Sequence, residues 1–129
     1  MYGTCEENRI ATEVVDSALK LHKHFGPGVY ENVYEATLMY ELKKRGFASR
    51  SQIPVPVVYD GISLDAGFKI DVLVNDLVIL ELKSVEKLEH VHFKQLLTYL
   101  RLTGLRLGLM INFGEAILKN DIHRVVNNL

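Results

Sequence analysis

Three side chains near the middle of the chain have the types and the spacing for phosphate-ester chemistry. Asp71 lies on one side of an expected turn, and Glu81 and Lys83 lie on the other side in a Glu-x-Lys pattern. Two facing carboxylates repel each other unless a cation lies between them, and oxygen ligands with room for water suit Mg²⁺. A lysine on the same face offsets the charge that develops on phosphoryl oxygens during hydrolysis. The pattern indicates metal-assisted hydrolysis, while a cross-strand salt bridge without catalysis accounts for the same residues.

A β-hairpin over residues 68–83 would position these side chains. Successive side chains of a strand point to opposite faces, so placing Asp71 opposite Glu81 separates the polar groups from a wholly aliphatic face. That face consists of Ile70, Val72, Val74, Val78, Leu80 and Leu82. A plain two-residue loop at Asn75 and Asp76 would instead pair Asp71 with Leu80 and mix acids with core residues on each face. The pattern therefore predicts a loop with an odd number of residues, or a bulge.

Two helices and an edge strand are expected before the hairpin. Thr4 and Glu7 form a capping-box pattern at the start of the first helix, which should end near Phe25 because a Gly-Pro-Gly run follows. Apolar residues at helical spacing then continue over 29–45. The prolines in 48–59 indicate an edge or bulged strand, the first of three strands in an antiparallel meander.

A helix and a buried strand are expected after the hairpin. Apolar residues recur at helical spacing until Gly104, which is placed to end the helix. Residues 105–113 form a short apolar run, which predicts a buried strand that pairs parallel within the sheet. Residues 116–120 indicate one more short strand, and residues 121–129 indicate a helical turn.

The composition of the whole chain is that of an ordinary globular domain. The 129 residues carry 15 Lys and Arg against 16 Asp and Glu, a formal net charge of -1, so any nucleic-acid contact must be local. Cys5 is the single cysteine, which excludes an internal disulfide, and no signal peptide or apolar run of membrane length is present. We therefore expect one domain over residues 1–129, located in the cytoplasm and without a membrane partner.

Further side chains with site chemistry lie on the expected helices. Glu31 shares one side of the second helix with Tyr34 and Glu35, although the helix dipole alone also favours an acid in a first turn. Gln95 and Tyr99 lie four residues apart on the third helix, where a carboxamide beside a phenol could hold a water, a phosphate or a DNA strand. An exposed glutamine beside a half-buried tyrosine is the commoner explanation of such a pair.

Basic residues and histidines are two further kinds of candidate ligand, for phosphates and for zinc. The basic residues gather in two places, at Lys43, Lys44, Arg45 and Arg50 and again at Arg101 and Arg106. Each group alone is typical of solvated helix ends, yet together they could follow a nucleic-acid backbone. The paired histidines are spaced two apart, which on a helix directs them away from each other, so a zinc site is discounted.

In chain order, these residues resemble the motifs of the PD-(D/E)XK nuclease superfamily. The motif residues are Glu31 on a helix, Asp71 on a strand, Glu81 and Lys83 on the next strand, and Gln95 and Tyr99 on a helix. Residues 28–34 also resemble the pattern for which the GxxExxY family is named, with Gly28, Glu31 and Tyr34 in the defining places. The resemblance spans nearly the whole chain. The proline in the superfamily's name is replaced by Ile70, which is a common variation.

The resemblance implies an α/β (α+β) fold with a restriction-endonuclease-like core, a mixed β-sheet flanked by helices in the order ααβββαβ. It also implies a Mg²⁺ or Mn²⁺ site, with DNA as the usual substrate class. On this analogy Asp71 and Glu81 hold the metal together with the backbone carbonyl of Leu82. Glu31 contributes a further acid, and Lys83 positions or activates water.

Gln95 and Tyr99 resemble the helix motif of RecB-like nucleases, where such residues support the site or the DNA end. The sequence thus points to a small metal-dependent phosphodiesterase that acts on DNA. The alternative is a non-catalytic nucleic-acid or protein interaction module of the same fold, in which the acids form a structural ion pair. Assembly into a homo-oligomer is a further alternative, since a chain this small offers a limited surface for gripping a duplex.

Overall fold

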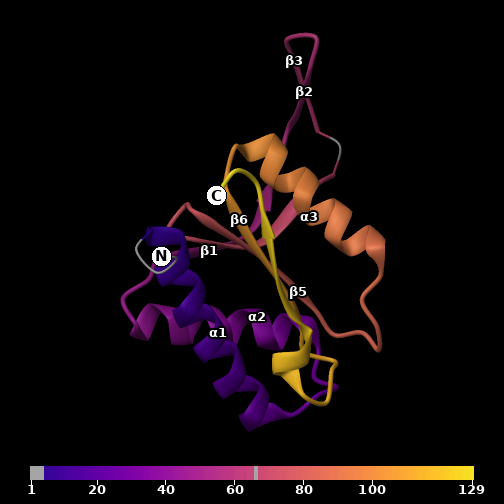
Figure 1. The fold of residues 1–129 in the computed structure, drawn as a ribbon. Coiled ribbons are helices and arrows are strands. Elements are labelled where there is room, and N and C mark those ends of the chain that lie inside the picture. The colour runs from indigo at the N-terminus through magenta and orange to yellow at the C-terminus, as the bar shows by residue number, and fades with distance from the viewer. Residues whose placement is uncertain (1–4, 66) are drawn as a thin grey trace.

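The computed structural model of the protein describes residues 5–65 and 67–129. Three helices are present in this part of the chain: α1 (Glu6–Phe25), α2 (Glu31–Lys44) and α3 (His90–Thr103). The strands are β1 (Ser49–Pro54), β2 (Val57–Tyr59), β3 (Ile62–Leu64), β4 (Lys69–Val74), β5 (Val78–Lys83), β6 (Leu107–Asn112) and β7 (Ile122–Val126), and the 3-10 turn η1 (Leu118–Asp121) precedes β7 (Figure 1). The first helix ends at Phe25 as expected. Thr4 of the expected capping box lies outside the described residues.

A five-stranded mixed sheet forms the centre of the fold, in the order β1-β4-β5-β6-β7. β5 and β6 run parallel and are joined through α3, while the other neighbouring strands are antiparallel. α1 and α2 pack on one face of the sheet, and α3 packs on the other (Figure 1). β5 and β6 are therefore covered on both faces, which explains their nearly continuous apolar sequence. This arrangement confirms the expected fold class.

The expected register of the central hairpin is also confirmed. β4 and β5 pair so that Val74 lies opposite Val78, which leaves a loop of three residues, Asn75, Asp76 and Leu77. Asn75 and Asp76 have positive φ angles of 51° and 55°. Asparagine and aspartate tolerate this left-handed conformation better than most residues, so the loop residues suit the turn.

The expected three-stranded meander is interrupted by a separate hairpin. β2 and β3 pair with each other, outside the main sheet, and form an arm that projects from the body (Figure 1). At the base of the arm, the backbone amide of Val55 donates to the carbonyl of Phe68 over 2.9 Å. Pro54 and Pro56 lack the amide hydrogen that a continuing sheet strand needs, so the chain leaves the sheet at this point.

The two predictions for the C-terminal segment are wrong. Residues 116–120, expected as a strand, form a bend and most of η1, and most of the expected helical turn is the edge strand β7. β7 pairs antiparallel with β6 alone, and Ile122 and Val125 pack against the two sides of the core. An edge strand needs few apolar residues, so the sequence of β7 lacks the apolar pattern that would have predicted a strand.

Candidate active site

Asp71 and Glu81 face each other just beyond the regularly paired part of β4 and β5. The regular pairing ends at Val72 and Leu80, one position before these two acids. Beyond it, the amide of Asp71 donates to Oε1 of Glu81 over 3.3 Å, and the amide of Leu82 donates to Oδ2 of Asp71 over 2.9 Å. Each carboxylate thus accepts a bond from the opposite strand, which keeps the two acids adjacent.

The pairing of β4 with β1, on the other side of Asp71, is also interrupted. Gln52 of β1 would be the partner of Asp71, but its φ angle is positive, at 53°, and the pairing skips from Ser51 to Ile53. A positive φ at a residue with a Cβ disrupts regular pairing. Ile70 consequently packs with the α3 side of the core, although it was expected on the aliphatic face with Val72.

Glu81 is buried, with only 3 % of its surface exposed. Burial first, and the nearby negative charge of Asp71 second, raise the pKa of Glu81 to about 8, against the lowering effects of the hydrogen bond from the Asp71 amide and of the Lys83 charge. Tyr99 lies in the same environment, since burial first and the Glu81 charge second raise the pKa of its phenol. Positive charge, from Lys83, therefore compensates the pair of acids only in part.

A hollow of about 230 Å³ opens beside these acids. Its lining combines the start of α2 with β1, β4 and β5: Glu31, Asn32, Glu35, Gln52, Asp71 and Leu82. Gln52 donates from Nε2 to Oε1 of Glu35 over 2.8 Å, which joins β1 to α2 across the hollow. The structure thus brings together Glu31, Asp71 and Leu82 around the hollow, while Glu81 contacts Asp71 but does not itself line the hollow.

Comparison with protein families gives a match to the PD-(D/E)XK nuclease superfamily over residues 8–125. The chain belongs to this superfamily. Its members are metal-dependent nucleases, and the mixed sheet with helices on both faces agrees with their restriction-endonuclease-like fold. Comparison with curated proteins and with solved structures gives no match. None of the described helices combines the length and the apolar character needed to cross a membrane.

The donor atoms of this PD-(D/E)XK site suit a small divalent cation. Carboxylate and carbonyl oxygens are the ligands that Mg²⁺ and Mn²⁺ prefer, and Mg²⁺ keeps several waters when bound to few carboxylates. A cation between Asp71 and Glu81 would also relieve the repulsion that raises the Glu81 pKa. Within the described residues, no group of three or more His, Cys, Asp or Glu side chains could hold a metal ion. A metal here would therefore depend on two carboxylates, the Leu82 carbonyl and water.

The remaining motif residues of the nuclease site lie at different distances from the acids. Lys83 ends β5 and is half-buried, and its charge acts on Glu81. Tyr99 is 3 % exposed and packs edge-on against Phe68, with ring centroids 5.7 Å apart. Gln95 lies one turn earlier on α3 and is half-buried, and in the described chain no hydrogen bond joins its carboxamide to the acids.

The segment over residues 28–34 anchors the start of α2 to the end of β5. Glu31 accepts a bond at Oε2 from the amide of Ser84 over 3.3 Å, and the Ser84 hydroxyl donates to the Val29 carbonyl over 3.1 Å. Gly28 has a φ angle of 93°, a conformation that favours glycine. Ser84 was not among the expected site residues, because only the fold brings it to a helix that lies far away in sequence.

Tyr34 has a structural role in the same segment. Its hydroxyl donates to the carbonyl of Gly26, and its ring stacks on Phe113 with centroids 4.0 Å apart. The side chain of Tyr34 is fully buried, whereas that of Tyr30, which precedes α2, is 81 % exposed. The motif tyrosine therefore fixes the Gly-Pro-Gly loop against the core.

Asn112 is a second residue that sequence reasoning missed. It is fully buried and lies opposite Lys83 in the parallel ladder. Its Oδ1 accepts from the amides of Val85 and Gly114 over 3.0 and 3.1 Å, and its Nδ2 donates to the Val85 carbonyl and to Oδ2 of Asp121 over 2.9 and 2.8 Å. These bonds hold the backbone that follows Lys83 in place.

Most of the basic residues expected to follow a nucleic-acid backbone form ion pairs with acidic side chains of the same chain. Arg45 binds Asp16 over 2.7 Å, and Arg50 binds Asp76 over the same distance. Arg106 binds the buried Glu7 over 3.0 Å. The alternative explanation, that these groups stabilise helix ends and loops, is the better description of these arginines.

Proposed function

We propose that this protein hydrolyses phosphodiester bonds of DNA with the help of Mg²⁺ or Mn²⁺. The observation that carries the proposal is a pair of backbone-to-carboxylate bonds, from the Asp71 amide to Glu81 and from the Leu82 amide to Asp71, where the regular pairing of β4 and β5 ends beside the hollow. Membership of the PD-(D/E)XK superfamily supports the same chemistry. The resemblance of residues 28–34 to the GxxExxY pattern supports placing the chain in that family.

Asp71, Glu81 and the Leu82 carbonyl are the proposed metal ligands, and Glu31 is a further acid that acts through water. A bound divalent cation supplies charge that stabilises the phosphoryl oxygens and lowers the pKa of a coordinated water. Glu31 lines the same hollow as Asp71 but already accepts a bond from Ser84. A water-mediated contact therefore suits Glu31 better than direct ligation.

The other motif residues have roles that follow from their positions. Lys83 would orient the attacking water and offset negative charge on the phosphate, because it follows Glu81 by two residues on β5 and its charge acts on that acid. Tyr99 is held near Glu81 by its packing in the core, and we propose that it and Gln95 support the acids from the α3 side. Exclusion of water around Glu81 strengthens each of these charge interactions.

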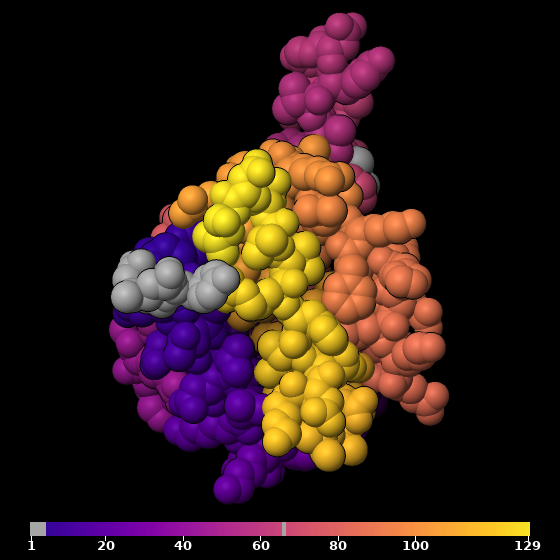
Figure 2. Space-filling view, in the orientation of Figure 1, coloured from indigo at the N-terminus to yellow at the C-terminus, as the bar shows by residue number. Residues whose placement is uncertain are grey.

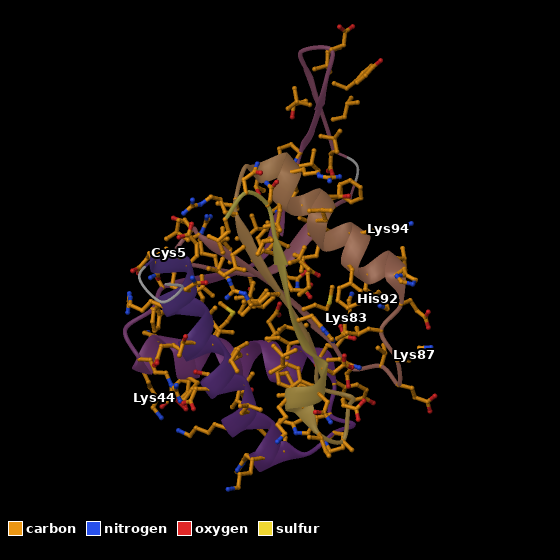
Figure 3. All side chains as sticks on the ribbon, in the orientation of Figure 1. Cys5, Lys44, Lys83, Lys87, His92 and Lys94 are labelled. Carbon is orange, nitrogen blue, oxygen red and sulfur yellow. The ribbon has the colours of Figure 1, made fainter. Side chains whose placement is uncertain are left out.

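DNA is the proposed substrate because exposed cations lie beside the site. Figure 3 shows Lys83, Lys87, His92 and Lys94 on the same side of the molecule, around the segment between β5 and α3. Lys87 and Lys94 are exposed, and in residues 5–65 and 67–129 neither forms an ion pair. These side chains, rather than the paired arginines, are the proposed contacts to phosphates on either side of the cleaved bond.

The proposal is tested by incubating the purified protein with linear, circular and single-stranded DNA in the presence of Mg²⁺ or Mn²⁺. Parent protein should cleave at least one form, and Asp71→Asn and Lys83→Ala should each lower the rate by about a hundredfold or more. Asp76→Asn, an exposed acid in the hairpin loop, is the matched control and should cleave normally.

A non-catalytic interaction module is the second candidate function. It is favoured by the backbone amides that already satisfy both carboxylates, which is also typical of a structural pair. DNA binding by the parent protein without cleavage under any metal condition would support this module and exclude the enzyme.

A further inference from the structure

The β2–β3 arm presents large apolar side chains to solvent. Figure 2 shows that it projects well away from the rest of the molecule. Val58, Tyr59, Ile62 and Leu64 are 65 %, 74 %, 59 % and 49 % exposed. An isolated two-stranded hairpin is marginally stable in water, and exposed apolar groups that are contiguous mark interaction surfaces.

The charge of the arm argues for a protein partner. Residues 57–65 contain Asp60 and Asp65 and no lysine or arginine. A surface with this charge is repelled by phosphates, so the arm is a poor contact for nucleic acid. A suitable partner surface would be hollow, apolar and bordered by a cation.

The same chain carries such a surface at the other end of β1. A hollow of about 610 Å³ lies between the end of α2 and the start of β1, lined by Met39, Tyr40, Lys43, Gly46, Phe47, Ala48 and Ser49. Tyr40 is 68 % exposed and stacks under the Lys44 ammonium, 5.6 Å from its ring centroid. Lys44 also binds Glu41, whereas Lys43 forms no ion pair with any residue in the described part of the chain.

We propose that the arm of one protomer docks into this hollow on a second copy of the chain, with Asp60 next to Lys43. The arm continues from Pro54 at the end of β1, and the hollow begins at Ser49 at its start. Two copies placed antiparallel along their β1 strands therefore bring each arm to the hollow of the other. Each protomer then supplies one arm and one hollow, and the two identical contacts form a closed dimer with two-fold symmetry.

The lengths of the two elements agree with this arrangement. β1 has six residues and spans roughly 20 Å, at about 3.3 Å per residue. The six residues from Val55 to Asp60 span at most roughly the same distance when extended. The tip of the arm can therefore reach past Ser49 of the partner protomer, to the part of the hollow that Phe47 and Gly46 line. The dimer does not depend on the proposed nuclease activity.

Sedimentation equilibrium over a concentration series tests the dimer. The parent protein should dimerise, and Tyr59→Ser/Ile62→Ser should be monomeric. Ile117→Ser/Val126→Ser is the matched control, since Ile117 and Val126 are 54 % and 51 % exposed outside both surfaces, and it should dimerise like the parent. A monomeric parent protein, or a dimer that survives the two substitutions in the arm, would overturn the proposal.

A charge exchange tests the pairing of arm and hollow without removing apolar surface. Asp60→Lys and Lys43→Asp should each weaken the dimer by roughly tenfold, and the combined variant should restore it. Failure of the combined variant to restore the dimer would overturn the proposed contact. Circular dichroism checks the fold of each variant. If Tyr59→Ser/Ile62→Ser lowers DNA affinity while the parent is monomeric, the arm is a nucleic-acid contact instead.

Discussion

The backbone amide of Asp71 donates a hydrogen bond to Oε1 of Glu81 over 3.3 Å, so the acid on β4 holds the acid on β5 by its main chain. The Asp71 carboxylate is in turn held by the amide of Leu82. The backbone thus positions two carboxyl groups side by side in a poorly solvated place, where Glu81, with a pKa of about 8, keeps its proton at neutral pH. A divalent cation can replace this proton and balance the charge of both carboxylates.

Asp71→Asn should stabilise the metal-free protein at neutral pH while removing its response to Mg²⁺. The neutral amide removes the charge that raises the Glu81 pKa, and its oxygen can still accept the bond from Leu82. We expect a gain of less than about 1 kcal/mol in the free energy of unfolding at neutral pH, because Glu81, with a pKa of about 8, is mostly protonated in the folded parent protein there. Urea denaturation in EDTA and in Mg²⁺ measures both effects. An equal shift by Mg²⁺ in parent and variant would contradict this prediction.

The stability of the metal-free protein should fall as the pH rises from about 4.5 to about 8, because the Glu81 pKa is raised on folding. Below this window the carboxyl is protonated in the folded and the unfolded chain, and its contribution is fully present. As the pH rises through the window, the unfolded chain releases the proton first, which favours unfolding by an amount on the order of a few kcal/mol.

Glu81→Gln provides the comparison for this pH dependence. Glutamine cannot ionise, so the difference between parent and variant should appear as the pH rises and be absent at low pH. Urea midpoints at a series of pH values in EDTA give the result. Parallel curves for the two proteins would show that Glu81 does not titrate in this window.

Asn112→Ala should lower the free energy of unfolding by about 3 kcal/mol, because it leaves several buried polar groups without partners. The amide and carbonyl of Val85 both lose their bonds to the Asn112 side chain. Asn120→Ala is the control, since Asn120 is exposed on η1 and should have little effect. Denaturation in urea measures the free energy of unfolding of the two variants. Equal values would contradict a stabilising role for the hydrogen bonds of Asn112.

Tyr34→Phe and Tyr34→Ala should separate the two functions of the motif tyrosine. Phenylalanine keeps the stacking on Phe113 but loses the bond to Gly26, for a cost of about 1 kcal/mol. Alanine also leaves a cavity and should cost about 3 to 5 kcal/mol. Tyr30→Phe, at an exposed position, is the matched control. Thermal unfolding of the three variants provides the measurement, and a larger loss in Tyr34→Phe than in Tyr34→Ala would be inconsistent with this division.

Much of the central fold could be predicted from local patterns. The alternation on either side of Asn75 specified the hairpin register, because a shift of one residue would have placed Asp71 and Glu81 on opposite faces of the hairpin. The apolar run after Gly104 indicated the parallel strand β6. The edge strand β7 was missed, because an edge strand needs few apolar residues. Strands on both sides of residues 60 and 61 were expected, but not that β2 and β3 pair outside the main sheet.

The residue types by themselves determined which groups could form the site: Asp71, Glu81 and Lys83 lie close in sequence on two paired strands. Only the tertiary structure decided that Glu81 is buried with a raised pKa, and that Ser84 and Asn112 tie the end of β5 to α2 and β6. The physical reason is that the alternation of side chains between the two faces of a strand depends only on residues that are close in sequence. Burial and hydrogen bonds between distant segments depend on how the helices and the sheet pack together.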